Sequence, residues 1–187
     1  MKLPFFTIGH SKRSLEAFVE LLTDVEIELV ADIRTIPRSR TNPQFNKDAL
    51  PGALAPFDIS YEHMAALGGL RGKARTSSHD VNGYWTNESF RNYADYALTA
   101  PFQTGLRRLI EEGLKRRCAL MCAEAVWWRC HRRIVADYLI ANGETVFHIM
   151  GEGRLEQARL TPGAVLQSDG TVVYPSVVGS DRPAIAD

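Results

Sequence analysis

The sequence has few cysteines, no long apolar run and no net charge. Its 187 residues include three cysteines, which is an odd number and too few for the disulfide framework of a small secreted domain. No apolar run approaches the roughly eighteen residues that a membrane-spanning helix needs. The amino-terminal residues also lack the apolar stretch and cleavage site of a secretory signal. We therefore expect a cytoplasmic protein with reduced thiols.

The charges balance, with 22 basic and 22 acidic residues and a formal net charge of zero. A neutral molecule has no long-range field that would hold it on nucleic acid or on an anionic membrane. Any anion binding is therefore expected to be local, and no membrane partner is expected. The chain contains no internal repeat, no P-loop and no glycine-rich dinucleotide fingerprint, so no cofactor is indicated.

The composition is typical of a folded domain, because 45% of the residues are hydrophobic and 24% are charged. Short aliphatic runs alternate with helical periodicities over residues 1–150. This alternation predicts an α/β fold, a three-layer sandwich with a mainly parallel central sheet. Residues 151–187 are predicted to form a C-terminal extension, with a small β-hairpin around Asp169-Gly170 and a tail, packed on the same domain.

The expected elements follow from local patterns. Ser14 and Asn87 are predicted helix N-caps, and Gly113 is a natural helix stop. Residues 68–86 show little periodicity and are expected to form a long loop that is either functional or mobile. Strands are expected at 3–8, 27–33, 59–64, 118–122 and 145–150, and helices at 14–24, 46–55, 87–98, 101–113 and 129–142.

Polar side chains follow the first two predicted strands. A strand, a helix and a second strand require a parallel pair joined by a right-handed crossover, so both strands end at the same edge of the sheet. His10 and Ser11 follow the first strand, while Asp32 and Arg34 belong to the end of the second. We expect these side chains to lie side by side. The stretch 122–133 follows a later strand and adds functional groups to this edge.

The stretch 122–133 is typical of a strand-to-helix turn. If its helix begins near Arg129, the first N–H groups and the helix dipole form an anion site. Arg129 or Arg132 could add bidentate recognition of a phosphate or carboxylate. Arg133 is expected instead to form a surface ion pair with Asp137, one helical turn later.

Two carboxylates and two histidines are candidates for acid-base chemistry. Asp32 and Glu124 each lie at the end of a predicted buried strand, where an unpaired carboxylate is costly. They are expected either to face a ligand or to pair with an arginine. His10 and His131 could share acid and base roles with them, or be satisfied core histidines. Trp128, which has a second tryptophan beside it, could offer a stacking surface.

The role of Cys122 and Cys130 stays open between three interpretations. They could form a tetrahedral zinc site with His10 and His131, although a separation of eight positions does not match the short Cys-x-x-Cys knuckle. Cys130, near the helix start, could be a nucleophile with a stabilised thiolate. Both could be small buried apolar residues, which is the interpretation that we favour from sequence.

Several short blocks resemble the signature of the DUF488 family, a widespread prokaryotic domain of unknown function. They run in order across roughly residues 5–150. The resemblance implies an α/β domain and little about activity. The blocks are Thr7-Ile-Gly-His-Ser11, Asp32-Ile-Arg34 with Pro37-Arg-Ser39, Asn42-Pro-Gln-Phe45, Leu67-Gly-Gly69, Phe90-Arg-Asn-Tyr-Ala-Asp95, Met121-Cys-Ala-Glu124 and Cys130-His-Arg132.

The first functional hypothesis is an enzyme, a hydrolase or transferase that acts on a small anionic or nucleotide-like substrate. Its site would be a polar pocket at the carboxyl edge of the sheet. The candidate catalytic residues are Asp32, Glu124, His131 and His10, and the candidate ligand-binding residues are Ser11, Arg34, Arg132, Arg129 and Trp128.

The alternative is a non-catalytic module that binds nucleic acid or a nucleotide through a local basic rim. Such binding would weaken steeply with salt. A metal or thiol-redox site is the third hypothesis, and the sequence indicates no oligomeric state. The residues of the basic rim are Arg34, Arg38, Arg40, Arg71, Lys73 and Arg75.

Overall fold

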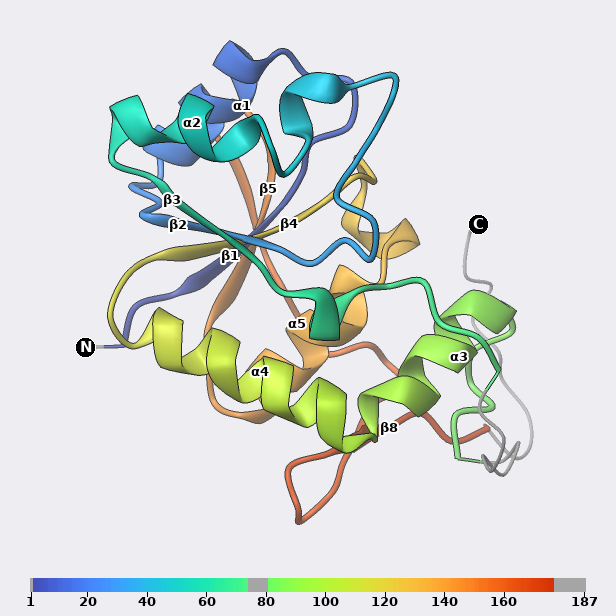
Figure 1. Ribbon diagram of the computed structural model, residues 1–187. Coiled ribbons are helices and arrows are strands. Elements are labelled where there is room, and N and C mark those ends of the chain that lie inside the picture. The colour runs from blue at the N-terminus through green and yellow to red at the C-terminus, as the bar shows by residue number, and fades with distance from the viewer. Residues whose placement is uncertain (1, 74–80, 177–187) are drawn as a thin grey trace.

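The computed structural model describes residues 2–73 and 81–176, which form an α/β fold around one six-stranded sheet (Figure 1). The strands are β1 (Phe5–Gly9), β2 (Leu29–Asp32), β3 (Ser60–His63), β4 (Cys118–Cys122), β5 (Val146–Gly151) and β6 (Arg154–Gln157). Their order in the sheet is β3-β2-β4-β1-β5-β6. The first five strands are parallel and β6 is antiparallel to β5, which confirms the predicted mainly parallel sheet.

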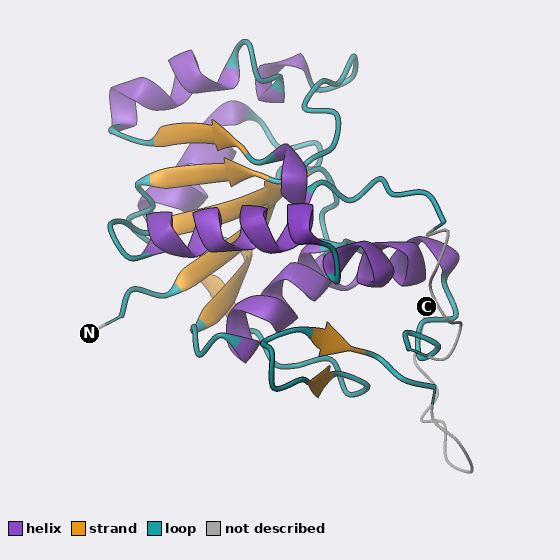
Figure 2. Ribbon diagram, turned by 60° about the horizontal axis from the view of Figure 1, so that its bottom comes forward, coloured by secondary structure: helices purple, strands orange, loops and turns teal. Residues whose placement is uncertain are grey.

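Helices cover both faces of this sheet. The helices α1 and α2 lie on one face, and α4 and α5 lie on the other (Figures 1 and 2). The predicted caps are confirmed, because the Ser14 side chain accepts from the N–H of Ala17, and Asn87 accepts from Ser89 and Phe90. The α-helices are α1 (Leu15–Thr23), α2 (Leu50–Leu54), α3 (Glu88–Ala97), α4 (Ala100–Gly113) and α5 (Arg132–Ala141); the 3-10 turns are η1 (Pro43–Phe45), η2 (Ala55–Phe57), η3 (Ala65–Leu67) and η4 (Trp127–Arg129).

The sheet separates two apolar cores, because successive side chains of a strand point to opposite faces. On β4, Leu120 packs into the core formed with α3, α4 and α5, whereas Met121 packs into the core formed with α1 and α2. On β2, Val30 belongs to the α1 and α2 core. The same alternation carries Cys122 toward the α5 face and Asp32 toward the α1 face. This separation decides which functional groups can meet.

Two elements differ from the sequence prediction. The strand β6 was not expected, because residues 154–157 are all exposed and carry no alternation of apolar and polar residues. The helix α5 begins at Arg132 and not near Arg129, since residues 127–129 form the separate turn η4. The prediction of an anion site at a helix start near Arg129 is therefore wrong, because no α-helix starts there.

The predicted C-terminal hairpin is confirmed. The strands β7 (Val165–Leu166) and β8 (Val172–Val173) pair in antiparallel fashion. Gly170 turns the chain between them with a φ of 83°, a backbone conformation that favours glycine. Val172 and Tyr174 are buried and pack in the same core as α5. The hairpin thus adds side chains to the core of the α/β fold.

The expected surface ion pair between Arg133 and Asp137 is wrong. Asp137 is buried and accepts hydrogen bonds from the backbone N–H of Thr161 at 2.8 Å and from the hydroxyl of Tyr174 at 2.8 Å. Arg133 donates instead to the hydroxyl of Thr161 at 3.0 Å. The helical spacing placed Asp137 on the same side as Arg133, but the residues that follow β6 cover that side and exclude water from the carboxylate.

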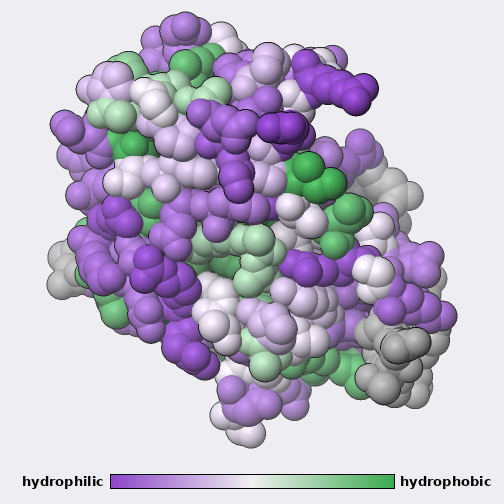
Figure 3. Space-filling model, in the orientation of Figure 1, coloured by the Kyte–Doolittle hydropathy of each residue, from purple (hydrophilic) through white to green (hydrophobic). Residues whose placement is uncertain are grey.

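None of the helices in residues 2–73 and 81–176 is long and apolar enough to cross a membrane. Hydrophilic residues predominate on the face shown in Figure 3, where apolar residues form only small separate groups among the coloured residues. Single exposed apolar residues of this kind are ordinary on a protein surface.

Candidate functional site

A cavity of about 360 Å³ opens at the carboxyl ends of β2 and β4. Its walls come from residues 34–36 after β2, residues 122–124 around the end of β4, residues 129–131 before α5, residues 69–71 and residues 89–90. The chain leaves β4 toward α5 on one face of the sheet and leaves β2 toward α2 on the other (Figure 1). The cavity therefore lies at a topological switch point, where open α/β sheets commonly bind ligands.

Two cysteines and a histidine meet on the wall of this cavity. The Nδ1 atom of His131 lies 3.9 Å from the Sγ of Cys122 and 3.6 Å from the Sγ of Cys130. The side-chain ligand atoms of all three residues lie within 4.8 Å of one another. Both cysteines are buried and the histidine is half-buried. We call these three residues the Cys-Cys-His cluster.

The backbone carbonyl of Ile33 orients the imidazole of His131. The Nε2 atom of His131 lies 2.9 Å from this oxygen, which can only accept, so Nε2 donates its proton. In the neutral ring this leaves Nδ1 unprotonated and facing the two sulfur atoms. The chain packs closely around the ring, because a Cβ atom on Gly69 would lie 2.2 Å from Nδ1. The glycine therefore allows its loop to close over His131.

The two thiols of the cluster differ in acidity. A hydrogen bond from Cys130, together with the neighbouring His131, holds the pKa of Cys122 well below its usual value. Burial raises the pKa of Cys130 well above its usual value, and its contact with Cys122 adds to the effect. The thiol of Cys122 is therefore the more acidic of the two.

Asp32 lies outside the cavity lining. It is fully buried on the α1 face and accepts hydrogen bonds from the Nε of Arg34 at 2.8 Å and the Nη2 at 2.6 Å. The hydroxyl of Tyr61 donates to the same carboxylate at 2.6 Å. Asp32 therefore holds Arg34 in place, and the alternation along β2 directs it away from the cluster.

His10 belongs to the same network as Asp32. Its Nδ1 donates to the carbonyl of Ser11 at 2.9 Å, and its Nε2 accepts from the Nη1 of Arg34 at 3.2 Å. Its ring stacks on Phe45 with 4.4 Å between centroids, and burial lowers its pKa. His10, Asp32 and Arg34 do lie together as expected. His10 and Asp32 do not join Glu124 and His131 in one pocket, which corrects that expectation.

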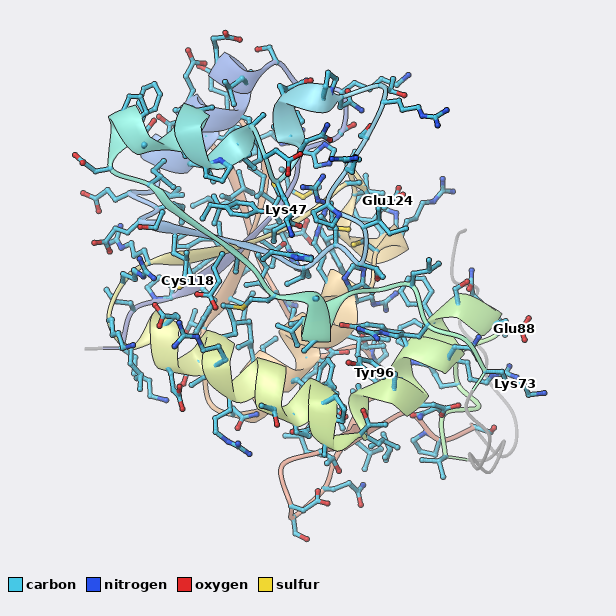
Figure 4. All side chains as sticks on the ribbon, in the orientation of Figure 1. Lys47, Lys73, Glu88, Tyr96, Cys118 and Glu124 are labelled. Atoms are coloured by element: carbon cyan, nitrogen blue, oxygen red, sulfur yellow. The ribbon has the colours of Figure 1, made fainter. Side chains whose placement is uncertain are left out.

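Glu124 lines the cavity and is exposed. The strand β4 ends at Cys122, and the chain then turns outward through the exposed Ala123. Within residues 2–73 and 81–176, no salt bridge involves the Glu124 carboxylate. Figure 4 shows its position at the end of β4 opposite to Cys118. The carboxylate is therefore available to a ligand.

Arg132 supports the loop that carries Glu124. It is 1% exposed and donates from Nη1 to the carbonyl of Glu124 at 2.7 Å and from Nη2 to that of Ala125 at 3.0 Å. Gly9 permits this close packing, because a Cβ atom there would lie 1.8 Å from the Glu124 carbonyl oxygen. Arg132 is not part of the cavity lining and acts as a positioning residue.

Two arginines give the cavity a positive charge. Arg129 is exposed and forms no salt bridge with any described residue. Arg71 also lines the cavity and donates to the carbonyls of Gly68 and Ala65 at 2.9 Å each. The charge of Arg34, which also lines the cavity, is offset by Asp32. Glu124 is the only carboxylate among the described lining residues, so the positive charges exceed the negative ones.

Ser11 and Trp128 lie outside the cavity lining. The N–H of Ser11 donates to the carbonyl of Ala123 at 3.0 Å, so it ties the end of β1 to the loop after β4. Trp128 is 41% exposed and packs edge-on against Trp127, whose ring stacks on His148 at 4.4 Å. The expected stacking of a ligand on Trp128 stays a prediction.

The residues of the expected basic rim have different environments. Arg34 is buried against Asp32, and Arg38 pairs with Asp48 at 3.0 Å. Arg75 falls outside the described residues. Nucleic-acid binding stays a prediction, and these contacts add no support for it.

Fold and site together define an α/β protein with a thiol- and imidazole-lined cavity at the carboxyl ends of its parallel strands. The model of a family described as a domain of unknown function, DUF488, matches residues 14–139, which is more than half of the chain. The chain belongs to the DUF488 family, as its sequence blocks indicated. Comparisons with curated proteins and with solved structures gave no match.

Proposed function

We propose that the protein is an enzyme, a hydrolase or transferase, that acts on a small anionic substrate in the cavity at the carboxyl ends of β2 and β4. One observation carries the proposal: the Cys-Cys-His cluster, a carboxylate and two arginines converge on a single cavity. Structural ion-pair networks bury their charges against one another, whereas Glu124 and Arg129 face the cavity. Groups left available in this way favour a ligand-binding role.

The lining of the cavity favours a substrate with an anionic part and an apolar or planar part. Arg129 and Arg71 can donate to a phosphate or carboxylate group. Ile36 and Leu70, which are 64% and 72% exposed, and Phe90 supply apolar surface at the same cavity. The volume is near the lower end of the range for small-molecule sites. A nucleoside monophosphate or a similar ester has both features.

Glu124 is the proposed acid-base residue. Its carboxylate faces the cavity, so it can take a proton from a nucleophile or give one to a leaving group. The Cys-Cys-His cluster is the proposed reactive centre on the adjacent wall. Asp32 and His10, which are saturated by contacts with Arg34, Tyr61 and Ser11, act as supports and not as reactants.

The test is turnover of chromogenic p-nitrophenyl esters of phosphate, nucleoside phosphates and carboxylic acids by the Glu124→Gln variant. Loss of general acid-base catalysis should lower kcat by at least about 100-fold. The midpoint of urea unfolding should not change, because the side chain is exposed. The control is Glu152→Gln, an exposed carboxylate outside the cavity. Full activity in Glu124→Gln, or wild type inert toward the whole panel, contradicts the proposal.

A further inference from the structure

The Cys-Cys-His cluster has the spacing of a metal site. With Zn–S bonds of 2.3 Å and Zn–N bonds of 2.0–2.1 Å, tetrahedral geometry separates a sulfur and a nitrogen ligand by about 3.6 Å. The Nδ1 of His131 lies 3.6 Å from the Sγ of Cys130 and 3.9 Å from that of Cys122. All three atoms lie within 4.8 Å of one another. One ion can therefore reach all three after shifts of less than about 1 Å.

The orientation of His131 is a second, independent observation. A zinc-bound histidine usually donates its other ring N–H to a carbonyl or carboxylate, which fixes the ring and leaves the coordinating nitrogen unprotonated. Here Nε2 donates to the carbonyl of Ile33 at 2.9 Å, and Nδ1 faces both sulfur atoms. Edge-on packing of Tyr93, at 4.9 Å between centroids, further restricts the ring.

We propose that Cys122, Cys130 and His131 bind a zinc ion through Sγ, Sγ and Nδ1, with a fourth position open to the cavity. Two sulfur ligands and one imidazole favour zinc over magnesium or calcium, which prefer oxygen ligands. Two thiolates also neutralise the charge of the ion. Burial of two small apolar cysteines accounts for their low exposure. It does not account for the convergence of both sulfur atoms on one imidazole nitrogen, at 3.6 Å and 3.9 Å.

The open fourth coordination position is the feature that this site shares with catalytic zinc sites. Structural zinc sites have four protein ligands, whereas catalytic sites have three and leave one position for water or substrate. Among the described residues, no fourth His, Cys, Asp or Glu joins the cluster. Bound zinc would supply a Lewis acid there. The catalytic role of the ion rests on the proposed function, in which Glu124 accepts the proton of a bound nucleophile. The binding of zinc itself does not depend on that function.

The first experiment measures zinc binding by the wild-type protein. Protein purified without chelator is analysed for metal, then stripped and titrated with zinc in competition with a chromophoric chelator. One zinc per chain is expected, and cobalt at the same site should give a thiolate-to-metal charge-transfer band. Absence of saturable binding at one equivalent overturns the proposal. So does a Cys122–Cys130 disulfide in freshly purified protein, found by thiol counting after denaturation, because it assigns the pair to redox chemistry.

Matched variants then locate the ion. Replacement of a ligand in Cys122→Ser, Cys130→Ser or His131→Gln should weaken zinc binding by at least about 100-fold, since loss of an outer-shell partner alone costs up to that much. The control is Cys118→Ser, the third cysteine, which lies at the other end of β4 from Glu124 (Figure 4). It should bind zinc as wild type does. If Cys122→Ser and Cys130→Ser bind zinc with the wild-type affinity, the proposed site is wrong.

Failure of this inference is distinguishable from failure of the proposed function. Zinc binding is measured without substrate. If the protein binds no zinc but still binds anions and turns over substrate, the zinc site is rejected and the proposed enzyme function stands. Glu124→Gln should keep the wild-type affinity for zinc while losing turnover. If a ligand variant does not fold, the titration and cobalt spectrum of the wild type still decide.

Discussion

The charge of His148 is set by its surroundings. The side chain is 2% exposed, its Nδ1 lies 2.7 Å from the hydroxyl of Thr7, and its ring stacks on Trp127. Burial, with a smaller contribution from the charge of Arg132, lowers the pKa of His148 to about 3. At neutral pH the imidazole is therefore neutral in the folded protein, and the hydrogen bond with Thr7 requires no charge.

The stability of the fold should decrease as the pH falls. The unfolded chain binds a proton at the ordinary pKa of 6.5, whereas the folded protein does so only near 3, so the stabilisation present above pH 6.5 is lost between these values. The loss from His148 alone over this whole range is roughly 5 kcal/mol. Urea unfolding measured from pH 7 to pH 4 should show that the free energy of unfolding falls more steeply for wild type than for His148→Gln. Because His10 has a pKa lowered in the same direction, some decline remains in the variant. Parallel profiles contradict the prediction.

Arg129 should contribute directly to anion binding. It is exposed, lines the cavity and has no carboxylate partner among the described residues, so its full charge is available. Arg129→Ala should weaken binding of adenosine monophosphate about tenfold, the value of one charge-assisted hydrogen bond. Calorimetric titration at fixed ionic strength measures this. The matched control is Arg38→Ala, which removes an exposed arginine paired with Asp48 outside the cavity. Equal affinities in the two variants contradict the role of Arg129.

At the scale of the elements, the loop of residues 68–73 should depend on the small size of one glycine. A Cβ on Gly69 would lie 2.2 Å from the Nδ1 of His131, so either the loop or the ring must move. Gly69→Ala should lower the free energy of unfolding by about 1–3 kcal/mol and weaken anion binding. Gly72→Ala is the control, because a Cβ there meets no atom within 4 Å. Wild-type binding by Gly69→Ala contradicts the close packing.

The elements that the sequence predicted well are those with a strong local pattern. Aliphatic runs gave β1, β2, β4 and β5, and side-chain caps marked the starts of α1 and α3. The strand β6 escaped prediction, because an exposed edge strand needs no apolar side chains and its pairing is set by β5. The start of α5 was misplaced because residues 127–129 form a 3-10 turn, whose local pattern resembles the start of an α-helix.

The candidate site was predicted in part, and the reason lies in the period of a strand. Parallel topology brings His10, Asp32 and Cys122 to one edge, but the side-chain alternation sends the first two to the α1 face and the third to the α5 face. Counting positions from Leu120 would have revealed this. The contacts of Gly69 and Arg71 with the site depend on the path of a long loop, which local sequence patterns do not determine.

At the scale of the whole molecule, two residues of the C-terminal hairpin region, Val172 and Tyr174, belong to the main core. Tyr174 is fully buried, its hydroxyl donates to Asp137 at 2.8 Å, and its ring packs 5.1 Å from that of Trp85. Its backbone N–H donates to the side-chain oxygen of Asn82 at 3.0 Å. These contacts join the end of the hairpin to α5 and to the segment before α3. Unfolding of the hairpin should therefore require disruption of the core.

This packing predicts one cooperative unfolding transition and a large cost for a single truncation in the extension. Tyr174→Ala removes a buried ring and leaves Asp137 without one donor, so the free energy of unfolding should fall by about 4 kcal/mol. Leu166→Ala, in the exposed strand β7 of the same hairpin, should change it by less than about 0.5 kcal/mol. Urea unfolding followed by both tryptophan fluorescence and circular dichroism measures both quantities. Two separate transitions, or a small effect of Tyr174→Ala, would mean that the extension folds independently of residues 1–150.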